Sequence, residues 1–422
     1  MDKNNFDQDS FIGKSATDSN KKSVNPKDIF NNFLEKKRIF KNKEALSSTF
    51  VPTEILHRDE EIEKISNILA PALLLERISN VLIYGFSGTG KSLVTKYVAH
   101  NLGSMAAEKN VNVIPIHINC RLGNNDTEYR LVSNLCMFFG VEVPTSGLSV
   151  NALYKKLISA VDTQDRYVIL ILDEIERLIQ KAGDGVIYTL LRLNESLKHA
   201  KISIVGISNN IDLKSLLDQK VRSSLHPIEL VFKPYNAVEI ADIIKTRVSE
   251  SFYENSINEG IVMKCAALSA KENGDIRKTL NMLMVAGETA QSQGRSHISE
   301  EDLDAAAEVL EQNITEEMIK SMTKQSKCIL SAIISVAKSK RLGNVYSGEV
   351  YDAYIKIADK YALEKLTLRR ISDLIADMDY NSLITSRVKS NGRYGRTREI
   401  KVAFSPQFVS KVESMLREDL NI

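Results

Sequence analysis

Residues 81–92 combine an apolar strand with a glycine-rich turn and read Val-Leu-Ile-Tyr-Gly-Phe-Ser-Gly-Thr-Gly-Lys-Ser. The spacing matches the phosphate-binding P-loop, in which backbone N–H groups and the start of the next helix surround an anion. Lys91 can reach the terminal phosphates, and the Ser92 hydroxyl can hold Mg²⁺. The predicted ligand is therefore ATP or ADP with Mg²⁺. Its candidate contacts here are Gly85, Ser87, Gly88, Thr89, Gly90, Lys91, Ser92 and Leu93.

A second apolar run, residues 168–172, ends in Asp173-Glu174, 82 residues after Lys91. In a parallel α/β sheet the carboxyl end of such a strand lies beside the P-loop. Asp173 is then placed to bind Mg²⁺ and Glu174 to polarise an attacking water. The alternative is an ordinary buried strand followed by a capping aspartate. With the P-loop present, the pair predicts an ATPase.

Two further residues are candidates for sensing the γ-phosphate. Asn209 follows the apolar strand 202–208, and Arg277 lies at the start of a helical stretch in Gly-Asp-Ile-Arg. The fork of an arginine matches phosphate oxygens. The alternatives are a plain turn residue for Asn209 and a solvated helix charge for Arg277.

The elements that must position these residues alternate between strand and helix. Apolar runs at 81–85, 113–118, 168–172 and 202–208 are separated by helical patterns at 60–69, 91–102, 128–139 and 150–161. Strands that are apolar on both faces and alternate with helices indicate a parallel, doubly wound α/β sheet.

The pattern changes after Pro234. Residues 237–310 read almost entirely as helix, and helical stretches after 326 are followed by a hairpin around Asn391-Gly392-Arg393-Tyr394-Gly395, the outline of a winged helix-turn-helix. The predicted domains are a flexible polar tail (1–45), an ATPase core (46–235), a helical lid (236–315) and a winged-helix domain (316–422).

Composition limits the other possibilities. The chain has 422 residues, of which 43% are hydrophobic, which is enough for two or three domains. Without a long apolar run or a signal peptide, we expect a soluble protein with no membrane partner, located in the cytoplasm and associated with the nucleoid. The four cysteines and six histidines are scattered, which predicts buried thiols in a reducing compartment and no metal beyond the Mg²⁺ of the nucleotide.

Positive charge is concentrated near the C-terminus. Residues 318–422 hold 19 Lys+Arg against 11 Asp+Glu, whereas the preceding residues hold 37 against 43. Residues 380–405 alone hold six basic side chains against one acid, which indicates a wing that binds duplex DNA; a merely solvated basic hairpin is the alternative. The candidate DNA contacts are Arg369 and Arg370 on the expected major-groove helix 367–378, and Arg387, Lys389, Arg393, Tyr394, Arg396 and Arg398 on the hairpin.

These motifs together resemble the archaeal-type replication initiators related to the origin recognition complex and the cell-division-cycle loader, which are AAA+ ATPases. The resemblance covers residues 45–420 and is carried by six segments in unbroken order: 55–61 (Ile-Leu-His-Arg-Asp-Glu-Glu), 85–92, 172–174, 206–210, 274–277 and 391–397.

The resemblance implies roles for individual residues. Ile55 and Arg58 help to form the adenine pocket, Asn209 is sensor 1 and Arg277 is sensor 2; Tyr235 is a further candidate nucleotide contact. A helical addition between Cys120 and Gly140 contacts DNA, with Arg130 as its candidate residue, although a solvated arginine is the alternative.

One departure from the family pattern concerns the arginine finger. Where relatives commonly carry Asp-Pro-Arg-Val, this chain has Asp218-Gln219-Lys220-Val221, so a finger acting on a neighbouring subunit is in doubt and Arg222 is the nearest candidate.

The leading hypothesis is an ATP-binding replication initiator that recognises origin duplex DNA, hydrolyses ATP slowly as a regulatory switch, self-associates on DNA and recruits the replicative helicase. The alternatives are a signalling or transposition-helper ATPase whose C-terminal domain binds a protein, and a clamp-loader-like subunit with a helical collar.

Overall fold

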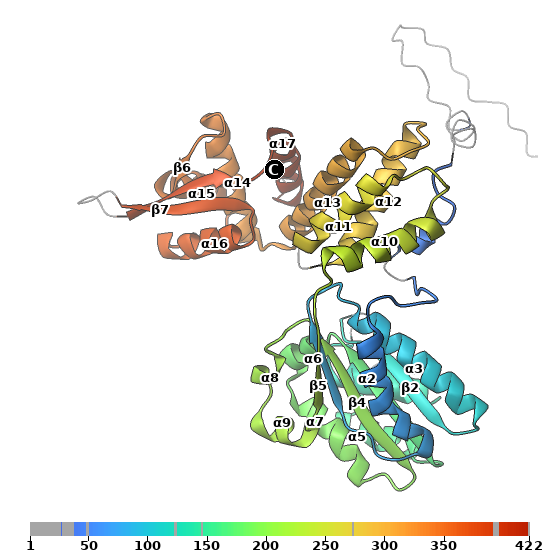
Figure 1. Cartoon of the computed structure of the whole chain (residues 1–422). Helices are drawn as coiled ribbons and strands as arrows, with labels where there is room; N and C mark the ends of the chain where they lie inside the picture. The colour runs from blue at the N-terminus through green and yellow to red at the C-terminus, as the bar shows by residue number, and fades with distance from the viewer. Residues whose placement is uncertain are drawn as a thin grey trace, which may run out of the picture.

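The chain forms three bodies in a computed structural model (Figure 1). The structure describes residues 27, 38–47, 50–121, 125–144, 147–271, 274–390 and 396–420. An α/β core carries a helical domain above it, and the C-terminal domain lies beside the helical domain (Figure 1).

The core is built on a parallel sheet of five strands in the order β2-β3-β4-β1-β5. The strands are β1 (Val81–Gly85), β2 (Val113–Asn119), β3 (Arg166–Asp173), β4 (Ala200–Ser208) and β5 (Ile228–Phe232). All their pairings are parallel, and β1 and β3 are buried along their whole length. The predicted α/β fold class is confirmed.

Helices cover both faces of this sheet because its strands are apolar on both sides. On one face, Leu82 and Leu170 pack with α4 (Glu128–Phe138), α5 (Val150–Val161), α6 (Ile175–Ala182) and α7 (Gly185–Arg192). On the other, Ile83 and Ile169 pack with α2 (Asp59–Leu69), α3 (Lys91–Glu108) and the 3₁₀ helix η2 (Ala70–Leu74). Three short helices complete the core: η4 (Leu193–Glu195), α8 (Leu213–Leu216) and α9 (Gln219–Leu225).

The helical domain consists of α10 (Ala237–Ser251), α11 (Glu259–Lys271), α12 (Ile276–Ser292) and α13 (Glu300–Ser321). A segment from far earlier in the chain completes its core. Ile39 and Leu46 are buried there, and the Phe40 ring packs on Phe252 with centroids 4.9 Å apart. The 3₁₀ helix η1 (Lys43–Leu46) belongs to this segment. Residues 38–45 were expected to belong to a flexible tail, but burial of their apolar side chains holds them on the helical domain. The polar residues around them hid this apolar signal in the sequence.

The C-terminal domain combines helices with a small antiparallel sheet in the order β6-β8-β7. Its elements are α14 (Lys324–Ser339), β6 (Val345–Tyr346), α15 (Ser347–Lys360), α16 (Leu368–Tyr380), β7 (Ile384–Ser390), β8 (Arg396–Val402) and α17 (Pro406–Leu420). Three helices followed by the β7–β8 hairpin form the predicted winged helix.

Helix α13 belongs to both of the last two domains. Leu303 and Ala306, near its start, are buried in the helical domain, whereas Ile319, near its end, is buried in the C-terminal core. One continuous helix therefore links the two bodies.

Two properties concern the molecule as a whole. The four cysteines are buried as free thiols. Among the residues that the structure describes, no helix has the length and apolar character needed to span a bilayer.

Candidate functional site

A cavity of about 660 Å³ lies between the core and the helical domain. Because the carboxyl ends of parallel strands meet at one edge of a sheet, the P-loop after β1 shares this wall with the ends of β2, β3 and β4. The opposite wall comes from α10 and α12. The predicted residues that line the cavity are Ile55, Gly88, Thr89, Gly90, Lys91, Ser92, Leu93, Asp173, Glu174, Asn209, Tyr235 and Arg277. Gly85 and Ser87 do not line it, but the Gly85 carbonyl accepts a hydrogen bond from Lys91 and the Ser87 hydroxyl donates one to Asp275.

The P-loop turns through two glycines with left-handed backbone, Gly88 (φ +77°) and Gly90 (φ +89°). Lys91, the first residue of α3, points back into this turn. Its ammonium donates hydrogen bonds to the carbonyls of Gly85 (2.8 Å) and Phe86 (2.6 Å) and to Asn209 Oδ1 (2.9 Å). The structure thus brings Lys91 and Asn209 into direct contact, at the place where a terminal phosphate would enter.

Keeping Lys91 charged in this buried position costs free energy. Burial is the main cause that lowers its pKa from 10.5 to about 8, and the nearby Arg277 lowers it further, while Asp173, Glu176 and Asp275 act in the opposite direction. Between pH 8 and 10.5 the unfolded chain holds more protons at this lysine than the folded protein, so this group makes stability increase as the pH rises through that range.

We expect nucleotide binding to take up a proton at Lys91. The phosphate anion restores the pKa of the lysine, so that at pH 8 about half a proton enters the complex and at pH 6.5 almost none. Calorimetry in buffers of different ionisation enthalpy measures this uptake. Lys91→Arg, whose side chain does not titrate in this range, should show no uptake at pH 8, where the nucleotide phosphates are already ionised; uptake that persists in Lys91→Arg at pH 8 assigns it to another group.

Asp173 and Ser92 offer the oxygen donors that Mg²⁺ prefers. Asp173 is only 6% exposed. Burial raises its pKa, but the close contact with His117 and a hydrogen bond from the Ser92 hydroxyl outweigh burial and hold the pKa below the usual range. A hydroxyl and an ionised carboxylate held together in this way fit the predicted metal. When bound, Mg²⁺ supplies positive charge that neutralises the phosphate oxygens.

Glu174 sits in strained backbone directly after β3, in the left-handed region at φ 55° and ψ 44°. Such a conformation is unfavourable for a non-glycine residue and is retained mainly at functional sites. Asn119, the last residue of β2, donates to Glu174 Oε1 at 3.5 Å, and Arg121 Nη1 lies 3.9 Å from Oε2. The sequence analysis missed Asn119, although its place at the end of a buried strand is the same signal that identified Asp173.

Helix α12 reaches the P-loop from the helical domain. Asp275 caps this helix through the Arg277 N–H (3.0 Å) and accepts a hydrogen bond from the Ser87 hydroxyl (3.1 Å). The Arg277 guanidinium also donates to Ser87 Oγ. The approach is close, because a Cβ on Gly88 would lie within 2.1 Å of the Asp275 carboxylate. The predicted sensor is therefore within reach of the phosphate end.

Arg58 is placed differently from the role implied by the resemblance. Its guanidinium stacks on the Tyr235 ring at 3.7 Å and donates to the carbonyls of Thr89 (3.0 Å) and Lys233 (2.7 Å). It is 5% exposed and is not among the residues that line the cavity, and its contacts connect the P-loop to the start of the helical domain. The physical reason is that its donors are already bonded to backbone carbonyls.

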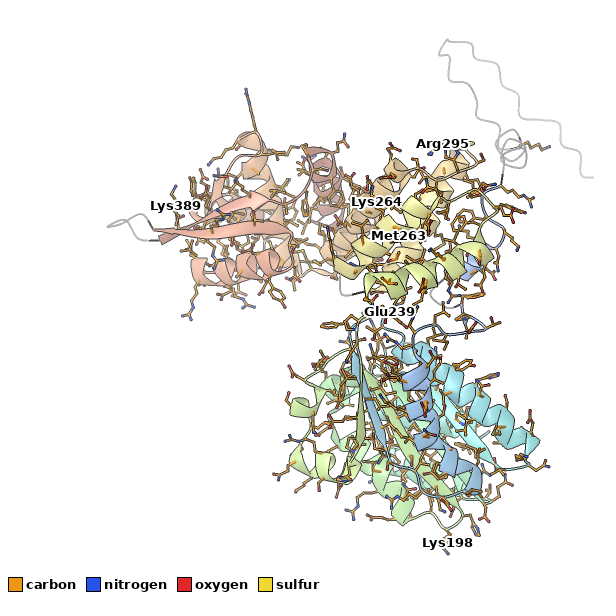
Figure 2. All side chains as sticks on the ribbon, viewed as in Figure 1. Lys198, Glu239, Met263, Lys264, Arg295 and Lys389 are labelled. Carbon is orange, nitrogen blue, oxygen red and sulfur yellow. The ribbon has the colours of Figure 1, made fainter. Side chains whose placement is uncertain are left out.

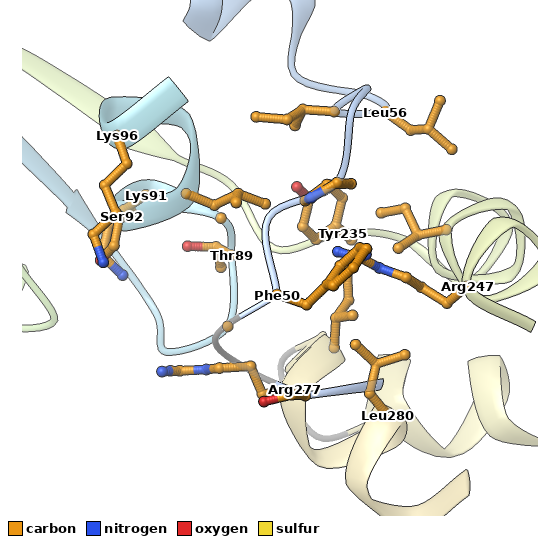
Figure 3. Close-up of a pocket in the computed structure, with 18 of the residues that line it drawn as sticks. Phe50, Leu56, Thr89, Lys91, Ser92, Lys96, Tyr235, Arg247, Arg277 and Leu280 are labelled. Carbon is orange, nitrogen blue, oxygen red and sulfur yellow. The ribbon is translucent and has the colours of Figure 1, made fainter. Parts of the chain in front are cut away.

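The base end of the cavity lies away from the phosphates and is mainly apolar. Ile55 and Leu56 face Ile276 and Leu280 of α12. Two residues that the sequence analysis missed complete it: Arg247 of α10, 7% exposed, lies over the Phe50 ring at 4.7 Å (Figure 3). An arginine within an amphipathic helix gave no sequence signal of this contact.

The candidate DNA contacts fall into three groups. Arg369 and Arg370 are exposed in the first turn of α16, and Arg387 and Lys389 are exposed on β7. Arg398 is half-buried and donates to Ser386 Oγ at 3.0 Å, so its side chain is already engaged within the hairpin. Arg393 and Tyr394 lie outside the described residues, as does the side chain of Arg396, whose backbone begins β8.

Three candidate residues of the core are exposed on helices. Arg130 lies on α4, in the predicted addition, while Lys220 and Arg222 lie on α9.

Comparisons with known proteins agree with this architecture. Three family models match: "AAA domain" over residues 76–214, "Cdc6 AAA+ ATPase-type lid domain" over 241–308 and "CDC6, C terminal winged helix domain" over 317–412. The chain is 42% identical over 398 residues to an ORC1-type DNA replication protein of Pyrococcus abyssi, covering 93% of this chain and 94% of that protein. It is 39% identical to the ORC1-type DNA replication protein 1 of Sulfolobus acidocaldarius, covering 90% and 94%. Among solved structures, it resembles the Aeropyrum pernix ORC1 protein in complex with DNA, with a TM-score of 0.77, 35% identity and coverage of 90% and 97%.

Proposed function

Because the chain belongs to the ORC1/Cdc6 family of AAA+ DNA replication initiators, we propose that it binds ATP with Mg²⁺ in the cavity between core and lid and grips origin duplex DNA with its winged helix. The observation that carries this proposal is the placement of Arg277. It lies on a lid helix, touches the P-loop at Ser87, and belongs to the domain whose last helix enters the winged-helix core.

The roles at the phosphate end follow from these contacts. Lys91 neutralises the terminal phosphates, and Asn209, already bonded to Lys91, orients the γ-phosphate or the attacking water. Ser92 and Asp173 hold Mg²⁺. Glu174 polarises the water as general base.

Nucleotide state acts as a switch through Arg277. With ATP bound, the Arg277 guanidinium leaves Ser87 and binds the γ-phosphate. After hydrolysis this attraction is lost, and the preferred angle between lid and core changes. A contact that is broken and remade once per cycle suits slow turnover. Because Lys220 stands where relatives commonly carry the finger arginine and Arg222 is only the nearest candidate, a neighbouring subunit stimulates ATP hydrolysis weakly.

DNA binding is proposed from charge and from the Aeropyrum pernix relative, whose structure is titled as a complex with DNA. Arg369 and Arg370 face the major groove, the β7–β8 hairpin follows the backbone, and Arg130 contacts the duplex from the core. We also propose self-association on DNA, recruitment of the replicative helicase, and a cytoplasmic location at the nucleoid.

The salt dependence of duplex affinity tests the DNA interface. If four basic residues of the hairpin each neutralise a phosphate, log K should fall with log salt at a slope of about −3.6, and the double substitution Arg387→Ala/Lys389→Ala should flatten it by about 1.8. Fluorescence anisotropy with a labelled duplex measures the slope.

The matched control removes two lysines elsewhere. Lys109 and Lys198 are exposed, and Lys198 lies at the end of the molecule far from Lys389 (Figure 2). Their replacement by alanine should leave the slope unchanged. An unchanged slope in the hairpin variant would show that β7 does not contact the duplex. A footprint that protects no defined duplex element would indicate a general DNA-binding ATPase and contradict origin recognition.

A further inference from the structure

His117 lies beside the carboxylate proposed to hold Mg²⁺. It is on β2, whose register against β3 pairs His117 with Ile171 and Asn119 with Asp173. Its Nε2 atom is 3.3 Å from Asp173 Oδ2, and the two side chains are 23% and 9% exposed. β2 is an edge strand that pairs with β3 along its whole length, and this register places His117 next to the end of β3.

The Nε2 atom of the imidazole lies next to the Asp173 carboxylate. Nε2 is fully buried, and no hydrogen bond of regular geometry reaches it from the residues that the structure describes. At 3.3 Å the contact with Oδ2 is long and not straight, but it is the polar interaction available to this atom. In the tautomer that carries its proton on Nε2, this buried donor has Asp173 Oδ2 as its nearest acceptor, and leaving that acceptor would cost free energy.

Asp173 is thereby held from several sides. Its Oδ1 accepts the Glu174 N–H at 3.1 Å, its Oδ2 faces His117, and the Ser92 hydroxyl donates to the carboxylate. Together these contacts fix the plane of the carboxylate at the sheet edge. Residues that orient a metal-binding carboxylate typically change metal affinity by about 10- to 100-fold when they are removed.

We propose that His117 is a positioning residue for the Mg²⁺ site: it holds the Asp173 carboxylate in the orientation that receives the metal of the bound nucleotide. The inference rests on the proposed nucleotide site. His117 itself does not coordinate the metal, because Mg²⁺ selects oxygen ligands and the imidazole offers nitrogen.

The role predicts a specific signature. Nucleotide affinity without metal depends on the P-loop and the base end, which His117 does not touch. The additional affinity that Mg²⁺ confers depends on the orientation of Asp173. Loss of His117 should therefore reduce the metal-dependent gain and leave the metal-free affinity unchanged.

The experiment measures the binding of fluorescent ADP to the full chain in EDTA and in Mg²⁺. The ratio of the two dissociation constants is the metal-dependent gain. In His117→Leu, which keeps volume but removes the donor, we expect the gain to fall about tenfold. In His117→Gln, whose amide can donate to Oδ2, it should stay within about threefold of the original. His199→Leu, at an exposed histidine paired with Asp165, is the control and should show the original gain.

The outcomes separate cleanly. A reduced gain in His117→Leu with rescue in His117→Gln supports the positioning role. An unchanged gain in His117→Leu overturns it, as does an equal loss of affinity in EDTA and Mg²⁺. If circular dichroism shows that His117→Leu does not fold, His117→Ala takes its place as the variant without a donor. An equal metal-dependent gain in His117→Ala and His117→Gln then overturns the positioning role. Absence of nucleotide binding by the unmodified chain contradicts the proposed function and not this inference alone.

Discussion

Replacing Glu174 by glutamine should reduce ATP turnover by about 10²- to 10³-fold, because the amide cannot accept a proton from the attacking water. ATP affinity should change little, since Lys91, Ser92 and Asp173 supply the phosphate and metal contacts. Glutamine also keeps the length of the side chain and can still accept the Asn119 hydrogen bond, which is 3.5 Å long in the native protein. Release of phosphate under single-turnover conditions measures the rate.

Glu195→Gln provides the matched control. Glu195 is an exposed glutamate of the same core that pairs with Arg192, so the same chemical change there should leave turnover unaltered. Turnover of Glu174→Gln within threefold of the original would assign the general base to another group. Equal losses of ATP affinity and turnover would instead indicate that Glu174 acts in binding.

Inserting one alanine after Asn313, within α13, should uncouple the two parts of the molecule that we propose to contact DNA. One additional residue rotates everything beyond it by about 100° and shifts it by about 1.5 Å. The winged helix would then present its basic hairpin in a different direction from Arg130 on the core. If both parts contact one duplex, affinity for a site that spans both should fall by about 10²-fold, because simultaneous engagement is lost.

The insertion point is chosen from burial. Asn313 is exposed. Before it in α13, Leu303 and Ala306 are buried in the lid. After it, Ile319 is buried in the winged-helix core. Asn313→Ala changes the same position without changing the length and is the control. Nucleotide affinity should be equal in both variants. An insertion variant that keeps its full duplex affinity and its response to nucleotide would show that the orientation set by α13 is unimportant.

The sequence pointed to Lys91, Asp173 and Asn209 as one site because each follows an apolar strand of the core, and the structure places all three on the wall of one cavity. Asp173 ends β3 and Lys91 follows β1 through the P-loop turn, and a parallel sheet brings the carboxyl ends of its strands to one edge. The winged-helix outline was also visible, and the family matches confirm it.

Other features depended on contacts between distant segments, which local patterns do not report. Strand β5 was not predicted because it is an edge strand, with Ile228 and Val231 exposed, and lacks a continuous buried run. The base-end pair Phe50–Arg247 joins residues nearly 200 positions apart. The direction of the Arg58 side chain likewise depends on Lys233, at the far end of the core.

The segment 38–47 has a consequence for how the protein is made. Its partners in the lid are distant in the chain: the Ile39 N–H bonds Gln291 across a separation of 252 residues. At ordinary rates of translation, roughly 10–50 s pass between the synthesis of these two residues. During that interval Ile39 and Leu46 have nothing to pack against, while the intervening α/β core can already fold as a unit. The lid core can therefore be completed only after α12 has been synthesised, although its first apolar residues, Ile39 and Leu46, leave the ribosome before the whole α/β core.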